Sequence, residues 1–186
     1  MQGSEEAGIH RMQTTSSGMK PAAEEPLPRR PPSTLPHSVD ILVVEDSPLE
    51  VELTLRPLHE LESEGEIAVA RDGEEALDFL FGRGGYRSRS GAPPPRLILL
   101  TLKLPKLDGL EVLRAIRTNS RTSTAPVVVL TSAGDPRELA QCYQLGANSC
   151  VQKPVHFEDL RSVLQTIARY WLGLNQSPPG PALPLV

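Results

Sequence analysis

A chain of 186 residues with 39% hydrophobic residues is long enough for one domain of ordinary size together with tails. Its 19 basic and 23 acidic residues give a formal charge of -4, and no run of Lys and Arg concentrates positive charge, which argues against binding of nucleic acid. No segment approaches the roughly 18 apolar residues of a membrane span, and the N-terminus lacks the apolar core of a signal peptide. We therefore expect a cytoplasmic protein without membrane contact.

Both ends of the chain are rich in proline. Residues 1–37 contain PLPRRPP among charged and small polar residues, and residues 175–186 repeat this composition. Such segments offer little apolar surface to offset the entropy of ordering them, so two disordered tails are expected around a domain of residues 38–174. The alternative for PLPRRPP is a polyproline II ligand for a partner domain, but motifs this short recur by chance.

Between the tails, apolar β-branched runs alternate with segments of helical period, which predicts a parallel sheet with crossover helices. The run VDILVVED (39–46) suits a strand buried on both faces, and Pro48 suits the first position of the helix that follows. That helix is expected to bend or end near Pro57. EIAVARDGEEALDFLF (66–81) predicts a second strand, a turn and a second helix.

The same alternation continues to the end of the predicted domain. GRGGYRSRSGAPPP (82–95) is rich in turn formers and basic residues and predicts an exposed loop. Further strands are predicted in RLILLTL, APVVVLTSA and SCVQKP, and further helices in LEVLRAIRTN, in PRELAQCYQLG and from about Phe157. Five strands alternating with five helices predict a doubly wound α/β fold, for which we take the flavodoxin-like sheet order 2-1-3-4-5 as the expectation.

Polar residues stand where the predicted strands end. An open parallel sheet binds ligands beyond the carboxyl ends of its strands, where the strand order reverses. In the expected order Glu45 and Asp46 lie beside Thr101, with Thr131 and Lys153 across the cleft. Two carboxylates, a hydroxyl and an ammonium suit Mg²⁺ and a phosphoryl group. An FMN-binding redox protein is disfavoured, because VEDSPLE places carboxylates where a phosphate needs donors.

Over roughly residues 39–172 the sequence resembles the receiver domain of two-component response regulators. The resemblance is carried, in order, by ILVVEDSP, ARDGEEAL, LILLTLKLPKLDGLEVL, VVVLTSA and VQKPV. EEALDFLFGRGGY and ARYWLG resemble more narrowly the single-domain receivers that work with phytochrome-type histidine kinases. The resemblance implies a CheY-like (βα)5 domain with a signalling role in a phosphorelay, and no enzymatic activity.

The resemblance also implies roles for individual residues. Glu45 and Asp46 match the acidic pair that helps to hold Mg²⁺, and Lys103 matches the position whose backbone carbonyl completes the metal shell. Thr131 and Lys153 match the two residues that sense the phosphoryl group.

Two positions depart from the family pattern. Thr101 stands where receivers carry the phosphoaccepting aspartate, and Cys150 stands where they carry an aromatic ring that rotates inward on activation. A threonine hydroxyl is a weak nucleophile that needs an adjacent base, and the site loses one of three formal negative charges around the metal. We therefore expect weak or absent Mg²⁺ binding, and a Thr101 hydroxyl that bonds Asp46 or Lys153.

Two functions follow as hypotheses. The leading one is a pseudo-receiver that acts through phosphorylation-independent protein contacts and requires no cofactor. The alternative is a receiver that is still phosphorylated in a histidine kinase phosphorelay, with Glu45, Asp46 or Asp108 as acceptor. O-phosphorylation of Thr101 by a serine/threonine kinase is disfavoured, because such sites usually lie on accessible, mobile segments.

Protein partners are expected, with a histidine kinase or another signalling protein among them. Receivers also dimerise through the fourth helix, fifth strand and fifth helix, so a homodimer is a further expectation. The residues of interest on that surface are Arg137, Gln141, Tyr143, His156, Tyr170 and Trp171. Tyr143, Tyr170 and Trp171 are the candidate interface anchors, although Trp171 equally suits closing the core. Cys142 and Cys150 lack CxxC spacing and are expected to be reduced, part-buried thiols.

Overall fold

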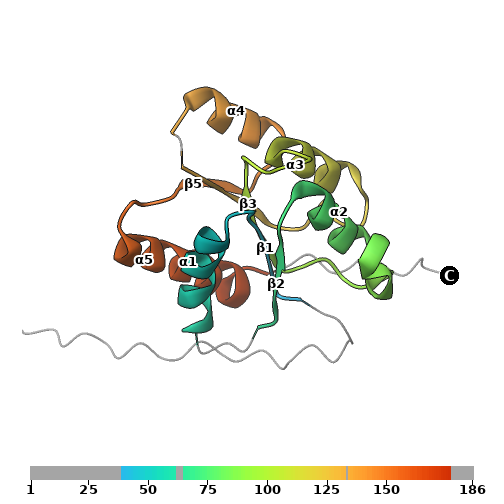
Figure 1. Cartoon of the computed structure of the whole chain (residues 1–186), viewed down its shortest axis with the longest axis horizontal. Coiled ribbons are helices and arrows are strands. Elements are labelled where there is room, and N and C mark those ends of the chain that lie inside the picture. The colour runs from blue at the N-terminus through green and yellow to red at the C-terminus, as the bar shows by residue number, and fades with distance from the viewer. Residues whose placement is uncertain (1–38, 62–64, 133, 177–186) are drawn as a thin grey trace, which may run out of the picture.

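The computed structural model describes residues 39–61, 65–132 and 134–176, so the tails expected at 1–37 and, apart from its first two residues, at 175–186 lie outside the described residues. Its five strands form one parallel sheet in the order β2-β1-β3-β4-β5 (Figure 1). The strands are β1 (Ile41–Val44), β2 (Ile67–Ala70), β3 (Leu97–Thr101), β4 (Val127–Thr131) and β5 (Ser149–Gln152). The predicted strand order and the flavodoxin-like α/β fold are confirmed.

Helices cover both faces of the sheet. They are α1 (Pro48–His59), α2 (Gly73–Phe81), α3 (Gly109–Thr118), α4 (Pro136–Gln144) and α5 (Phe157–Ala168). In Figure 1, α1 and α5 lie together on one face, and α2, α3 and α4 lie on the other. The apolar runs of β1, β3 and β4 are buried accordingly, which explains why their sequences are continuous rather than alternating. None of the helices in the described residues is long and apolar enough to cross a membrane.

Capping side chains explain where α1, α2 and α4 begin. The side chains of Ser47, Asp72 and Asp135 each accept a hydrogen bond from an amide in the first turn of the helix that follows. Helix α1 contains Pro57 and ends at His59, close to the proline as predicted.

The segment between α2 and β3 differs from its prediction as an exposed loop. Gly84–Arg89 form a 3-10 helix (η1), and Arg89 is buried with its guanidinium 3.9 Å from the ring centroid of Phe79. The ring of Tyr86 also packs edge-on against Phe79, at 5.3 Å between centroids. Most of the segment is exposed as predicted, but the prediction missed the 3-10 helix and the burial of Arg89, which depend on aromatic and cation–π contacts with Phe79.

The last helix is also more complex than predicted. Helix α5 ends at Ala168, and the chain continues as a π-helical segment (η2) over Arg169–Leu174. The guanidinium of Arg96 fixes this segment, because it donates a hydrogen bond to the carbonyl oxygen of Leu172 and pairs with Asp40 at 3.1 Å.

The loop between β3 and α3 lies tightly against α2. A Cβ atom placed on Gly73 would lie 2.1 Å from the carbonyl oxygen of Leu107, so only glycine fits there. Lys106 in the same loop has a left-handed φ of 65°, and its Nζ atom lies 2.6 Å from Oδ2 of Asp72. The loop that follows Thr101 is therefore held against the N-terminus of α2.

Candidate functional site

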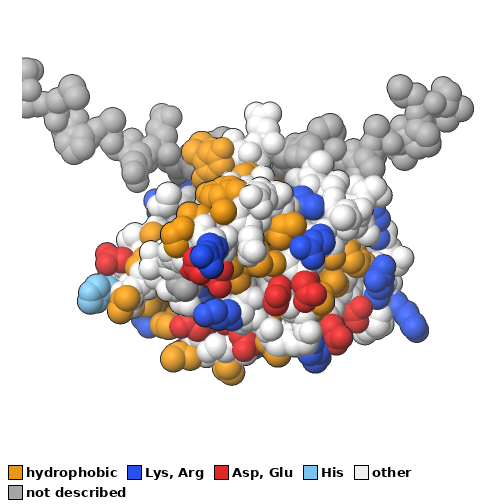
Figure 2. Space-filling model, turned by 90° about the horizontal axis from the view of Figure 1, so that it is seen from above, with side chains coloured by type: hydrophobic (Ala, Val, Ile, Leu, Met, Phe, Trp, Pro, Cys, Tyr) orange, Lys and Arg blue, Asp and Glu red, His pale blue; other side chains and the backbone are white. Residues whose placement is uncertain are grey.

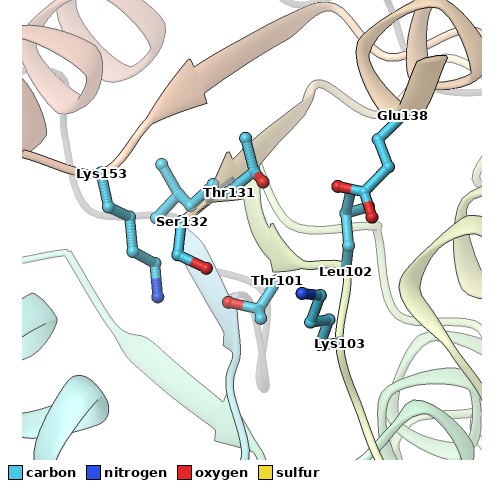
Figure 3. A pocket seen from close by; sticks show the side chains of 8 residues that line it. Thr101, Leu102, Lys103, Thr131, Ser132, Glu138 and Lys153 are labelled. Carbon is cyan, nitrogen blue, oxygen red and sulfur yellow. The ribbon is translucent and has the colours of Figure 1, made fainter. Parts of the chain in front are cut away.

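The strand ends bring the predicted polar residues to one edge of the sheet. Thr101 ends β3, Thr131 ends β4, and Lys153 follows β5. A small hollow, called here the Thr101 hollow, is lined by Thr101, Leu102, Lys103, Leu130, Thr131, Ser132, Glu138 and Lys153 (Figure 3). The fold thus brings Thr131, Lys153 and Lys103 together around the position of the missing aspartate.

Glu45 is the buried anion beside this hollow, with 4% of the residue exposed. Its Oε2 atom accepts hydrogen bonds from Thr101 Oγ1 at 2.6 Å and from Lys153 Nζ at 2.7 Å. The prediction that the Thr101 hydroxyl bonds Asp46 or Lys153 was therefore wrong. Asp46 is exposed to solvent, so of the two adjacent carboxylates only Glu45 lies where the hydroxyl can reach it.

Lys153 is held between two carboxylates. Besides Glu45, its Nζ atom lies 3.1 Å from Oε2 of Glu50, which belongs to the first turn of α1. Burial alone would raise the pKa of Glu45, but the hydrogen bonds from Lys153 and Thr101 outweigh it and leave that pKa lowered. The lowered pKa keeps Glu45 ionised at neutral pH, where it is paired with Lys153. The contribution of Glu50 was not anticipated, since a first-turn glutamate also suits a solvated helix start.

These residues do not fit a divalent cation in the arrangement that the structure shows. Glu45 faces an ammonium group, Asp46 is turned to solvent, and Thr101 offers a hydroxyl whose proton is already donated to Glu45. Within residues 39–61, 65–132 and 134–176, no three His, Cys, Asp or Glu side chains are grouped as for a metal ion. The lysine supplies the positive charge that Mg²⁺ would otherwise bring to Glu45.

A pair of thiols lies between α4 and β5, at the position where the resemblance to receivers implies an aromatic ring. Cys150 lies on β5 and packs against the buried Cys142 of α4, and both cysteines are free. Burial, reinforced by the neighbouring Cys142, raises the pKa of Cys150 to about 12. The backbone N–H of Cys150 donates to the hydroxyl of Tyr143 at 3.4 Å. Cys150 is therefore a part-buried thiol on β5, outside the lining of the Thr101 hollow.

The interface candidates differ in accessibility. Tyr143 on α4 and Tyr170 in η2 are 52% and 50% exposed. Trp171 instead packs against the core cluster beneath α1 and α5, with its ring 5.1 Å from that of Tyr170. Arg137, Gln141 and His156 are exposed. Tyr143 and Tyr170 are thus available to a partner, whereas Trp171 contributes to the core.

The upper face of the molecule in the view of Figure 1 carries mixed charge. Figure 2 shows Lys and Arg side chains next to Asp and Glu side chains over the coloured part of this face. Mixed charge of this kind differs from the continuous basic surface that nucleic acids select.

Comparison with known proteins now identifies the family. Residues 41–165 match the response regulator receiver domain. The chain belongs to this family. A receiver relative from Methanothrix harundinacea, named as the probable methanogenesis regulatory protein FilR2, is 44% identical over 76% of this chain and 88% of its own length. The response regulator Rcp1 of Synechocystis is 38% identical over 71% of this chain and 88% of its own length.

Solved receiver structures agree with the fold. The Mn²⁺-bound form of Rcp1 matches with a TM-score of 0.69 and 37% identity, over 75% of this chain and 98% of that one. The phosphorylated cyanobacterial phytochrome response regulator RcpA matches with a TM-score of 0.71 and 32% identity, over 76% of this chain and 99% of that one. The chain is thus a receiver of two-component signalling, similar to proteins whose structures contain a bound metal or a phosphoryl group.

Proposed function

We propose that this receiver is a pseudo-receiver, which acts by phosphorylation-independent contacts with other signalling proteins. One observation carries the proposal: the Thr101 hydroxyl and the Lys153 ammonium are both bound to the same oxygen of Glu45, at 2.6 and 2.7 Å. The aspartate that would accept a phosphoryl group is replaced by Thr101, and the Glu45 carboxylate already binds both the Thr101 hydroxyl and Lys153.

The chemistry of Thr101 supports this reading. Transfer of a phosphoryl group to a hydroxyl requires a base that removes its proton. Glu45 lies within reach, but its pKa is lowered, so it holds a proton poorly at neutral pH. Removal of its negative charge would also leave Lys153 paired with Glu50 alone. Thr101 therefore acts as a hydrogen-bond donor to a structural carboxylate.

The alternative acceptors have less support. Oδ1 of Asp108 accepts hydrogen bonds from the amides of Leu110 and Glu111, where it caps α3. Glu45 is engaged by Thr101 and Lys153. Asp46 is exposed and remains the best placed alternative, so phosphorylation there is the second candidate.

The proposed partner surface includes α4 and the π-helical end of the domain. Leu139 and Tyr143 lie four residues apart on α4 and are 43% and 52% exposed, which places two apolar side chains on the outer face of one helix. Tyr170 is exposed in η2. A histidine kinase or another protein of a two-component pathway is the proposed type of partner, and the domain binds it without a phosphorylation signal.

The test is phosphorylation itself. Purified protein is incubated with acetyl phosphate and Mg²⁺, and its intact mass is measured beside that of Rcp1 treated in the same way. We expect no phosphoryl adduct on this chain and an adduct on the control. An adduct mapped to Asp46 would establish the second candidate instead. Binding is tested by capturing a given partner from the native host with treated and with untreated protein. We expect both to capture equal amounts.

A further inference from the structure

Glu138 brings a second carboxylate to the Thr101 hollow. It lies in the first turn of α4 and reaches from that helix toward Leu102 and Lys103 (Figure 3). Its Oε2 atom is shielded from solvent and has no hydrogen-bond partner among the described residues. Burying a carboxylate oxygen without a hydrogen-bond donor lowers the stability of the folded protein, so the position of Glu138 in this hollow needs a functional explanation.

The two lysines that line the hollow offer little attraction to an incoming anion. Lys153 is one of the two ammonium groups that line it, and that group is bound to Glu45 and Glu50. Lys103 is the other, and its side chain is exposed. The Glu138 carboxylate faces the same space, so an incoming phosphoryl group would find one engaged lysine, one solvated lysine and the partly shielded carboxylate of Glu138.

We propose that Glu138 excludes oxyanions from the Thr101 hollow and forms a second barrier to phosphorylation, separate from the loss of the acceptor aspartate. This inference rests on the proposed pseudo-receiver function. Like charges in a part-buried site repel strongly because little water screens them. Restoring the acceptor alone would then leave the hollow closed to a phosphoryl donor.

The experiment compares four full-length variants: Thr101→Asp, Glu138→Gln, Thr101→Asp/Glu138→Gln and Thr101→Asp/Glu52→Gln. Glu52 is an exposed carboxylate on α1, and its replacement by Gln matches the charge change at a site outside the hollow. Each variant is incubated with acetyl phosphate and Mg²⁺, and the rate of acyl phosphate formation is followed by intact mass. Circular dichroism verifies that each one is folded.

The expected result is acyl phosphate formation at least about tenfold faster on Thr101→Asp/Glu138→Gln than on Thr101→Asp, with Thr101→Asp/Glu52→Gln equal to Thr101→Asp. Equal rates for Thr101→Asp/Glu138→Gln and Thr101→Asp would overturn the role of Glu138. A folded Thr101→Asp/Glu138→Gln that accepts no phosphoryl group would overturn it as well. Neither result would affect the pseudo-receiver proposal, which fails only if the wild-type chain itself is phosphorylated.

A second measurement does not depend on a restored aspartate. Inorganic phosphate is titrated into isotope-labelled wild type and Glu138→Gln, and the amide resonances of Lys103, Thr131 and Ser132 are followed. Saturable shifts are expected in Glu138→Gln at a phosphate concentration about tenfold or more below that needed for wild type. Identical titrations would contradict an anion-excluding role.

Discussion

The Nζ atom of Lys153 lies 2.7 Å from Oε2 of Glu45, although the two residues are 108 positions apart in the chain. This contact joins the end of β1 to the end of β5 at the two sides of the cleft. Both side chains are largely buried, at 12% and 6% exposed, so each depends on the other for its charge to be tolerated.

The first prediction concerns this ion pair. Replacement Lys153→Met is expected to lower the free energy of unfolding by about 3 kcal/mol, because it leaves the Glu45 charge buried without its cation. Urea denaturation followed by far-UV circular dichroism measures the change. Lys103→Met removes an exposed ammonium from the same hollow and is expected to change stability by less than about 0.5 kcal/mol. Equal effects of the two variants would show that the Lys153 pair is energetically unimportant.

The second prediction concerns the hydroxyl of Thr101. Thr101→Val keeps the shape of the side chain but removes the donor to Glu45, so the free energy of unfolding should fall by about 1–2 kcal/mol. Thr118→Val removes a hydroxyl that bonds backbone carbonyls at an exposed position of α3, and it serves as the control with a smaller expected loss. A Thr101→Val protein as stable as wild type would mean that Lys153 alone satisfies Glu45.

The third prediction is a pH dependence. The pKa of Glu45 is lowered in the folded protein from an ordinary value of 4.5, so the folded state favours the ionised carboxylate. Its stabilising contribution is complete above the unfolded-state pKa and is lost as pH falls through the lower folded-state value. The difference in unfolding free energy between wild type and Glu45→Gln, measured by urea denaturation from about pH 7 to pH 3, should therefore shrink toward the acid end. A difference that stays constant over this range would contradict the assignment.

The fourth prediction concerns Cys150. With a pKa of about 12, its thiol is almost entirely protonated at pH 8. Alkylation of Cys150 by iodoacetamide in the wild-type chain, distinguished from Cys142 by peptide mass spectrometry, should therefore be slower than that of a free cysteine by roughly a thousandfold, because the thiolate is the reactive form. Labelling in urea should restore the ordinary rate. Fast labelling of the folded protein would show that the thiol is neither buried nor neutral.

The alternation of continuous apolar runs with helical segments predicted the doubly wound α/β fold, and the order 2-1-3-4-5 follows from the flavodoxin-like topology that the receiver resemblance also implies. The sequence also placed Thr101, Thr131 and Lys153 at one edge, since parallel strands all end on the same side. What it could not provide was the partner of each side chain. Glu45 and Asp46 are adjacent in sequence and equivalent in chemistry, yet only the direction of the backbone after β1 decides which one is buried.

The sequence also did not predict two site residues that lie on helices. Glu50 and Glu138 each lie in a first helical turn, where acidic side chains usually serve the helix dipole, so their positions carried no separate signal. Only the packing of α1 and α4 over the strand ends brings these two carboxylates to Lys153 and to the hollow. Arg89 was hidden for a similar reason, because its burial depends on the ring of Phe79 in another element.

The close approach of Gly73 to the carbonyl oxygen of Leu107 has a mechanical consequence. The loop after Thr101 packs backbone to backbone against the start of α2, and the ion pair between Lys106 and Asp72 adds a second contact between them. Helix α2 is joined in turn to η1, where the hydroxyl of Tyr86 donates to Glu75 at 2.7 Å. A displacement of that loop must therefore carry the N-terminus of α2 with it, and a substitution at Gly73 would disturb the Thr101 edge without touching any residue that lines the hollow.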